Sequence, residues 1–372
     1  MKTFFNLIQD VQKRGLCHHC GGCVTFCTAI NYGALELDED GRPCYKDAEK
    51  CIECGLCYLI CPEVHELDEE QKRLASWSDP MGRVLDTSIA RAKDENVRLR
   101  GTDGGVVTAI LLHLFDMGFI GGAIVAKQVG PFQRLPWLAL SREDILEAAG
   151  FHFDTSHGMK LFSDEYSTYA PAIHELGPLA RQGPRRIAFV GTPCQINTVR
   201  RMEALGIVPA DAIKYHLGLF CTGNFVFGDE QRRKLEEIGG FRWDEVKKVN
   251  VKEELMIHLK DGKKISIPLE KLECMKRYAC RFCGDYSAEF ADVSFGGIAA
   301  EEGWTTVITR TPLGRAIMAG ARGEVLESYR SEGSPSPGKK ALGIVREWSD
   351  KKKERAAQNR EDLASKPVSV KG

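Results

Sequence analysis

The chain has 372 residues, of which 43% are hydrophobic and 28% charged, with a formal net charge of −1. This length and composition predict two or three folded domains, and a near-neutral charge gives no electrostatic reason to expect a nucleic-acid partner. No apolar run reaches the roughly 20 residues that span a bilayer, and residues 1–10 lack a secretory pattern, so the 14 cysteines indicate metal or redox chemistry in a reducing cytoplasm.

Residues 1–15 contain an amphipathic segment with Phe4, Leu7, Ile8 and Val11 at helical spacing. Two cysteine runs follow, each with the spacing C-x2-C-x2-C-x3-C. This pattern is typical of ferredoxins with two [4Fe-4S] clusters, in which the fourth cysteine of each run binds the other cluster. The predicted ligand sets are Cys17, Cys20, Cys23 and Cys61 for one cluster, and Cys51, Cys54, Cys57 and Cys27 for the other.

Zinc is the alternative for these runs, but zinc sites use isolated cysteine pairs, whereas each run here supplies four cysteines in line. Glycines 21, 22 and 55 fall inside the loops, where a missing Cβ allows close approach of the backbone. His18 and His19 lie between two ligands, and we interpret them as cluster surroundings. The module runs to about residue 65, and an acidic linker with a short helix follows.

From about residue 85 the pattern changes to alternating strands and helices. The loop GTDGG at 101–105 leads into a predicted helix that closes at Gly118, and a strand follows at 122–128. A glycine-rich loop at a helix N-terminus can bind phosphate through free N–H groups and the helix dipole. It is not a dinucleotide fingerprint, which requires G-x-G-x-x-G after a strand. The simpler alternative is a helix cap at Asp103.

Residues 141–150 predict a short helix capped by Ser141. The polar and aromatic stretch after it, residues 151–171, has no clear period and is interpreted as a lid or a ligand-lining loop. His152, His157 and His174 lie in or near this stretch, and structural or solvated roles are favoured over metal binding.

Two apolar strands end at cysteines: Cys194 follows RRIAFVG and Cys221 follows AIKYHLGLF. The ligand crevice of an open α/β sheet lies beyond the carboxyl ends of its strands, so the two thiols can meet there. Cys280 and Cys283 add a C-x2-C pair. We predict a third cluster held by Cys194, Cys221, Cys280 and Cys283; the alternatives are a structural zinc or unrelated structural cysteines. Cys44 and Cys274 are interpreted as spare.

Residues 290–311 predict two strands around a glycine-rich turn, in which Gly296 and Gly297 allow close approach either to a cofactor or between the strands. After Gly343 the tail predicts a charged helix that is polar nearly all round. Such a helix is either a solvated extension or a docking arm for a partner protein.

Several motifs together resemble the family of β subunits of the coenzyme F420-reducing hydrogenase, which includes the input subunit of the membrane-bound F420 dehydrogenase and the β subunit of F420-linked formate dehydrogenase. The resemblance covers about residues 85–345, and the front ferredoxin module makes the dehydrogenase input subunit the most similar arrangement. The motifs are GTDGGVVTA at 101–109, GTPCQI at 191–196, LFCTGNF at 219–225, CRFCGDYSAEFADVS at 280–294 and GWTTVITRT at 303–311.

This resemblance implies an FAD, a [4Fe-4S] cluster beside it that matches the third cysteine set, and a pocket for the 5-deazaflavin coenzyme F420. The FAD contacts that it implies are Thr102, Asp103, Gly104 and Gly105, with Thr192 and Asn224 as further candidates. The loop at 151–170 is longer and richer in histidine than in the hydrogenase subunit, which leaves the hydride donor open.

The predicted fold class is mixed α/β. A bacterial-type two-cluster ferredoxin domain occupies residues 1–75, an FAD-binding mixed-sheet domain with the third cluster residues 76–343, and a charged helical tail residues 344–372. The strand order of the central domain is not predicted.

The predicted function is an electron relay that works in either direction between F420 and a partner protein, through FAD and three [4Fe-4S] clusters. The predicted location is the cytoplasm, where a partner can hold the protein at a membrane. No side chain is assigned as a catalytic acid or base. Expected partners are a complex I-like arm, a hydrogenase, a formate dehydrogenase, a heterodisulfide reductase or a free ferredoxin. The alternatives are a flavoenzyme that uses NAD(P)H or another donor, and a non-catalytic iron-sulfur relay.

Overall fold

The computed structural model describes residues 1–29, 32–38, 41–130, 133–150, 186–207, 210–225, 229–251, 253–330 and 336–365. The predicted loop at 151–170 and the histidines at 152, 157 and 174 lie outside these residues. The helices are α1 (Phe4–Leu7), α2 (Gly22–Ala29), α3 (Leu56–Leu59), α4 (Asp68–Leu74), α5 (Glu95–Arg100), α6 (Val106–Asp116), α7 (Arg142–Glu147), α9 (Pro193–Ala204), α10 (Asp229–Gly239), α11 (Pro312–Ala321) and α12 (Pro337–Ser365).

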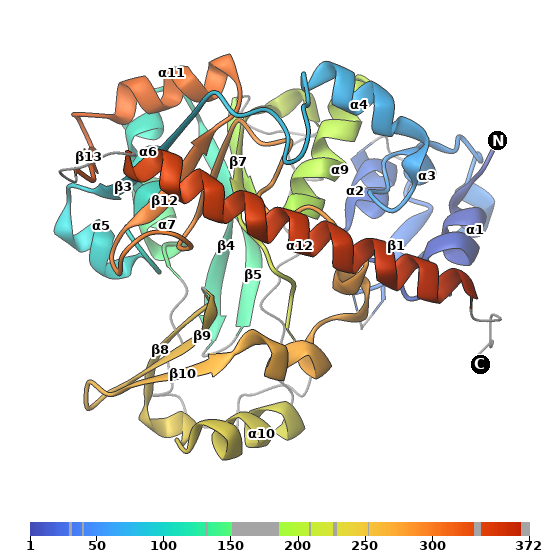
Figure 1. Cartoon of the computed structure of the whole chain (residues 1–372). Coiled ribbons are helices and arrows are strands. Elements are labelled where there is room, and N and C mark those ends of the chain that lie inside the picture. Colours follow the sequence, from blue (N-terminus) through green and yellow to red (C-terminus); the bar gives the residue numbers. More distant parts are fainter. Residues whose placement is uncertain are drawn as a thin grey trace.

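An eight-stranded mixed sheet forms the centre of the described part, in the order β13-β3-β12-β11-β7-β6-β4-β5 (Figure 1). Strands β4, β6, β7 and β11 are parallel neighbours, and antiparallel strands flank them on both sides. The strands are β3 (Asp86–Ala92), β4 (Gly122–Gly130), β5 (Gln133–Ala139), β6 (Ile187–Gly191), β7 (Ile213–Leu219), β11 (Val293–Gly296), β12 (Thr305–Thr309) and β13 (Leu326–Ser328).

Helix α6 begins and ends where the sequence predicts, and α7 begins at the predicted cap but ends at Glu147, before the predicted end at residue 150. Helix α6 starts after Gly105 and is followed by Gly118, and both glycines have the positive φ that suits them. Helix α7 is capped by Ser141, whose hydroxyl accepts from the Asp144 N–H. Strands β11 and β12 pair antiparallel, as predicted for residues 290–311.

The ferredoxin module is a compact unit of α1 to α3 with a small hairpin, β1 (Leu35–Leu37) and β2 (Pro43–Tyr45), and it packs against α9. Phe26 and Ile60 of the module share one buried apolar cluster with Ile196, Val199 and Met202 of α9. The module therefore shares a core with the sheet domain, which fixes its position relative to the cysteines of that domain.

Residues 229–275, for which no element was predicted, form a separate layer of α10 and a three-stranded antiparallel sheet. Its strands are β8 (Val246–Val251), β9 (Glu254–Leu259) and β10 (Lys264–Pro268). Leu255, Ile257 and Leu259 alternate with less buried residues along β9 and form a core with Trp243 of the same layer. Figure 1 shows this layer below the central sheet.

The prediction for the tail needs correction. Helix α12 begins at Pro337, before the predicted boundary at 343, and lies across the sheet domain to the ferredoxin module (Figure 1). It is neither solvated all round nor projecting, because one stripe of it is buried against this chain at intervals of three and four residues. The stripe consists of Gly338, Ala341, Val345, Ser349, Lys352 and Ala356.

Candidate functional site: three thiol cavities beside a glycine-rich cavity

The two ferredoxin runs place their eight thiols around two cavities. Gly21 and Gly55 have positive φ and turn the chain into α2 and α3, which carry cysteines from both runs. Cys17, Cys20, Cys23 and Cys61 line the first cavity together with Cys57; we name it the Cys17 cavity. Cys27, Cys51, Cys54 and Cys57 line the second, the Cys27 cavity. The fourth cysteine of each run thus lies with the first three of the other, as the predicted ligand sets require.

A third cavity, the Cys194 cavity, brings together four cysteines from three distant segments. Cys194 lies at the start of α9, directly after β6, and Cys221 lies after the carboxyl end of β7. The other two come from the segment before β11, and all four line the cavity: Cys194, Cys221, Cys280 and Cys283. Cys44 and Cys274 line none of the three cavities, and the exposed Cys274 contacts Lys234.

Burial makes several of these thiols poor candidates for free thiolates, whereas the buried His18 beside Cys280 lowers the pKa of that thiol. Burial raises the pKa of Cys17 and of Cys57 to about 12 and that of Cys221 to about 11. A thiol with a raised pKa gives up its proton readily when a metal cation binds the sulfur, so the donor sets suit a thiophilic metal such as iron. Within the described residues no group of three or more His, Cys, Asp or Glu side chains is arranged to hold a metal ion. The four thiolates of a [4Fe-4S] cluster bind four different irons, so they lie farther apart than thiolates that share a single metal ion.

His18 and Lys352 supply polar contacts at the Cys194 cavity. His18 Nε2 lies 2.7 Å from Glu63 Oε1. Burial alone would lower the pKa of His18, but hydrogen bonds to Cys280 and Glu63 raise this pKa to about 10. This position agrees with its interpretation as cluster surroundings. Lys352 Nζ donates to the carbonyl oxygens of Cys221 and Asp285, both at 2.7 Å.

Lys352 was missed by sequence reasoning, which treated the tail as polar on all sides. The signal that could have found it is the spacing of the small or apolar residues at 338, 341, 345 and 356. Lys352 continues that stripe, so a lysine stands on the buried face of the helix.

A fourth cavity, which we name the glycine-rich cavity, has a volume of about 270 Å³ and lies at the carboxyl ends of β6, β7 and β11, beside the middle of β4. This is the edge of a parallel sheet where ligands bind. Four of the predicted cofactor contacts line it: Thr102, Asp103, Gly105 and Thr192. Thr192 also lines the Cys194 cavity, so the two cavities share a wall.

The other two predicted contacts lie elsewhere. Gly104 does not line the glycine-rich cavity; its N–H donates to Thr305 Oγ1 at 3.0 Å, and a Cβ would lie 2.9 Å from the Ala90 carbonyl. Asn224 lines the Cys194 cavity instead, where its N–H donates to Cys280 Sγ. Gly104 therefore shapes the loop, and Asn224 is placed to act on a thiolate.

The alternative of a helix cap at Asp103 is wrong, because Gly105 is the N-cap of α6. The Asp103 carboxylate instead accepts from Asn250 Nδ2 at 2.9 Å. A Cβ on Gly297 would overlap Asp103 Oδ2, so this glycine allows close packing of the β11–β12 turn on the loop. Gly105 has no side chain to cap the first turn of α6, which suits an anionic ligand there.

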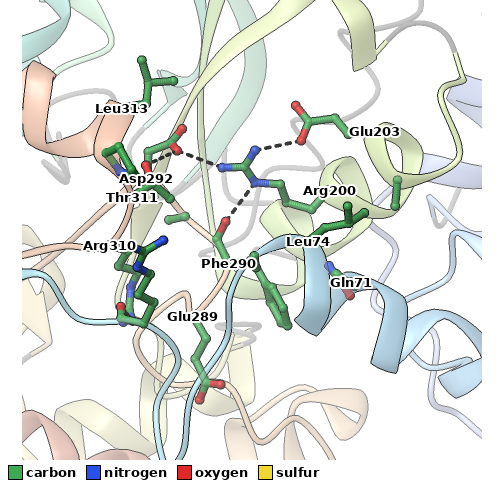
Figure 2. A pocket seen from close by; sticks show the side chains of 15 residues that line it. Gln71, Leu74, Arg200, Glu203, Glu289, Phe290, Asp292, Arg310, Thr311 and Leu313 are labelled. Atoms are coloured by element: carbon green, nitrogen blue, oxygen red, sulfur yellow. Dashed lines mark hydrogen bonds and ion pairs between the residues drawn. The ribbon is translucent and has the colours of Figure 1, made fainter.

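A larger cavity of about 570 Å³, the Arg200 cavity, lies between α4, α9 and the start of α11, and no motif predicted it (Figure 2). Arg200 donates to Glu203, to Asp292 Oδ1 at 3.0 Å and to the Phe290 carbonyl. Burial opposes ionisation of Asp292, but Arg200 and His216 hold its pKa well below the usual range. These charges pair with one another, so the network joins α9 to the sheet.

Comparisons with known proteins match both the cysteine-rich first part and the later part of the chain. Models of the coenzyme F420 hydrogenase/dehydrogenase β subunit match residues 87–163 (N-terminal part) and 184–330 (C-terminal part). A 4Fe-4S dicluster domain model matches residues 9–62, and a single-cluster ferredoxin model matches residues 47–95. No helix among the described residues is long and apolar enough to cross a membrane.

Two relatives and one solved structure show the extent of the similarity. The beta subunit of the coenzyme F420 hydrogenase of Methanothermobacter thermautotrophicus is 30% identical over 75% of this chain and 95% of its own length. A subunit of the F420H2 dehydrogenase of Methanosarcina mazei is 25% identical over 92% of each chain. A chain of the F420-reducing [NiFe] hydrogenase complex of Methanosarcina barkeri superposes with a TM-score of 0.65 at 26% identity, covering 77% of this chain and 94% of that one.

Proposed function

Because this chain belongs to the family of coenzyme F420 hydrogenase/dehydrogenase β subunits, we propose that it transfers electrons between coenzyme F420 and a partner protein, with one FAD and three [4Fe-4S] clusters as its cofactors. The observation that carries the proposal is the gathering of twelve cysteines around three cavities, each lined by all four members of one predicted set, with Cys57 shared by two of the cavities. The third of these cavities shares Thr192 with the glycine-rich cavity.

The chemistry belongs to the cofactors, and the protein binds and orients them. A flavin held by Thr102, Asp103, Gly105 and Thr192 would supply the conversion between a hydride donor and one-electron carriers. Oxidation of one reduced F420 would then deliver two electrons to the partner and two protons to solvent. Because neither the hydride step nor the electron transfer requires a side chain as acid or base, we assign no catalytic residue.

In this proposal the chain's own residues have three roles. Thr102, Asp103, Gly105 and Thr192 hold the flavin at the N-terminus of α6, where the helix dipole favours a phosphate. The twelve cavity cysteines bind iron. Asn224 directs its N–H toward Cys280 Sγ, and such hydrogen bonds to sulfur tune cluster potentials.

The partner is the rest of a redox complex, because relatives of this chain are named as subunits of an F420 hydrogenase and an F420H2 dehydrogenase. A hydrogenase, a formate dehydrogenase, a heterodisulfide reductase, a complex I-like arm and a free ferredoxin all accept single electrons. We propose a cytoplasmic location, with contact to a membrane only through such a partner.

A second candidate is an iron-sulfur relay without flavin. The observation that favours it is the volume of the glycine-rich cavity, about 270 Å³, which is slightly below the roughly 300–1,000 Å³ that is usual for ligand sites. This candidate predicts the same iron content but no reaction with a hydride donor.

Anaerobic purification followed by iron and flavin analysis tests the proposal. We expect one FAD per chain, and stopped-flow bleaching of the flavin by reduced F420 but not by NADH or NADPH. Fully iron-loaded protein without flavin would contradict the hydride step. Cys280→Ser should lower or alter the iron of one cluster only, about a third of the total, whereas Cys274→Ser, six residues away and outside the cavities, should leave the iron unchanged.

A further inference from the structure

The four cavities form a single row in which each shares one lining residue with the next. Thr192 lines both the glycine-rich cavity and the Cys194 cavity. His18 lines both the Cys194 cavity and the Cys17 cavity. Cys57 lines both the Cys17 cavity and the Cys27 cavity. Among the described lining residues, no other pair of these four cavities shares a member, so the row has no branch.

Direct contacts join the Cys194 cavity to the Cys17 cavity. Thr198 Oγ1 donates to the Cys194 carbonyl at 2.9 Å and lies 3.7 Å from Cys20 Sγ. A Cβ on Gly22 would overlap Thr198 Cγ2, so the start of α2 packs tightly on α9 at this point. The backbone carbonyl of His18 accepts from Arg277 Nη1 at 3.0 Å, which ties the first cysteine run to the segment that carries Cys280.

The Cys27 cavity lies at the other end of the row. Its described lining has no residue in common with that of the Cys194 cavity. This lining reaches the surface instead, because Ile52 is 56% exposed and Tyr32 is 39% exposed. One end of the row therefore lies at the sheet and the other end at the surface of the ferredoxin module.

We propose that the fold fixes the order of the two ferredoxin centres: the set Cys17, Cys20, Cys23 and Cys61 stands next to the third centre, and the set Cys27, Cys51, Cys54 and Cys57 is terminal. The inference rests on the proposed function, since it needs a centre in each thiol cavity. It goes further by making the Cys17 set the obligatory neighbour of the Cys194 set. It also makes the Cys27 set the point of exchange with the partner.

Electron paramagnetic resonance of the reduced full-length protein tests the order without flavin or F420. A low-potential europium(II) chelate reduces all centres, and a neighbouring reduced cluster broadens a signal through spin–spin coupling that falls steeply with distance. Cys283→Ser identifies the signal of the Cys194 set. We expect Cys20→Ala to remove the coupling from that signal and Cys54→Ala to leave it in place.

The reverse pattern, with coupling lost in Cys54→Ala and kept in Cys20→Ala, would overturn the order. If an alanine variant does not fold, Cys20→Ser and Cys54→Ser retain the cluster with an oxygen ligand and shift its spectrum. Cys20→Ser should then change the spectrum of the centre that is coupled to the Cys194 set, and Cys54→Ser should leave that spectrum unchanged. A change in the spectrum of that coupled centre caused by Cys54→Ser would overturn the order. Wild-type protein with iron for only two clusters overturns the proposed function, whereas iron for three with the wrong coupling overturns the order alone.

Discussion

Lys352 is the residue whose replacement tests the third centre most directly. Its ammonium group comes from the buried stripe of α12, and the side chain is nearly inaccessible at 4% exposure for the residue. It donates to the carbonyls of Cys221 and Asp285 at the wall of the Cys194 cavity. Lys352→Met keeps most of the volume of the side chain and removes only the charge and the two donated hydrogen bonds.

The expected change follows from Coulomb's law. The Lys352 ammonium is 2.7 Å from the carbonyl of Cys221. Two unit charges at a separation of roughly 6 Å, at an effective dielectric constant of about 20, interact by about 3 kcal/mol. For a one-electron couple this corresponds to about 0.1 V. A cation favours the more negative, reduced cluster, so Lys352→Met should lower the midpoint potential of this cluster by roughly 0.1 V. Two carbonyls that lose their donor should also lower the free energy of unfolding by about 2–4 kcal/mol.

The assay is a potentiometric titration followed by electron paramagnetic resonance, with iron content measured on the same samples. Lys351→Met is the matched control, because Lys351 is the adjacent residue of α12 and pairs with Glu347 in solvent. The reasoning is refuted if Lys352→Met retains full iron and all potentials stay within about 0.02 V of the control, a change below a tenfold shift in the redox equilibrium.

Three further predictions concern stability and docking. Gly338→Ala should lower the free energy of unfolding by more than about 2 kcal/mol, because a Cβ would overlap the Thr87 carbonyl. A Cβ on Gly343 of the same helix meets nothing within 4 Å, so Gly343→Ala should raise the free energy of unfolding by about 0.5–1 kcal/mol. Equal effects of the two substitutions in denaturant titrations would contradict this packing. Asp292→Asn should lower the free energy of unfolding by about 3–5 kcal/mol at pH 7. Because the pKa of folded Asp292 lies below its ordinary value of 3.8, the stabilisation by its carboxylate is present above pH 3.8 and is lost as the pH falls below it. The unfolding free energies of the two proteins should therefore converge as the pH falls, and a constant difference would exclude this cause. Ile52→Glu should slow the reduction of an added two-cluster ferredoxin at least about tenfold without slowing the reduction of methyl viologen. The control Leu99→Glu, at an exposed site on α5, should change neither rate. Equal rates of ferredoxin reduction in the two variants would exclude Ile52 from the docking surface.

The cysteine sets could be predicted from the sequence because their geometry is local or follows from a general rule. The spacing of each ferredoxin run places its thiols, and Cys194 and Cys221 follow parallel strands whose carboxyl ends meet at one edge. Both ends of α6 and the start of α7 followed from Gly105, Gly118 and Ser141, whose backbone freedom or side-chain cap acts within a few residues.

What could not be predicted depends on contacts between segments far apart in the chain. The burial of Lys352 depends on α12 meeting the Cys221 carbonyl, 131 residues away in sequence. The placement of Asn224 depends on Cys280, which leaves no local signal in the sequence around Asn224. The layer at 229–275 has ordinary strand alternation, but its role as a separate sheet appears only when its apolar face packs around Trp243.

Helix α9 explains how these separately predictable parts acquire one geometry. It carries Cys194 in its first turn, Thr198 one turn later beside Cys20, and Arg201 in the following turn. Arg201 is 1% exposed and donates to the carbonyls of Leu59 and Val64, which flank the last cysteine of the second run. A single rigid helix thus contacts the third thiol set at one end and the ferredoxin module along its length. Since a helix rises only about 1.5 Å per residue, the separation between the Cys194 and Cys17 cavities is set by a few residues of one element and not by the linker between the two domains.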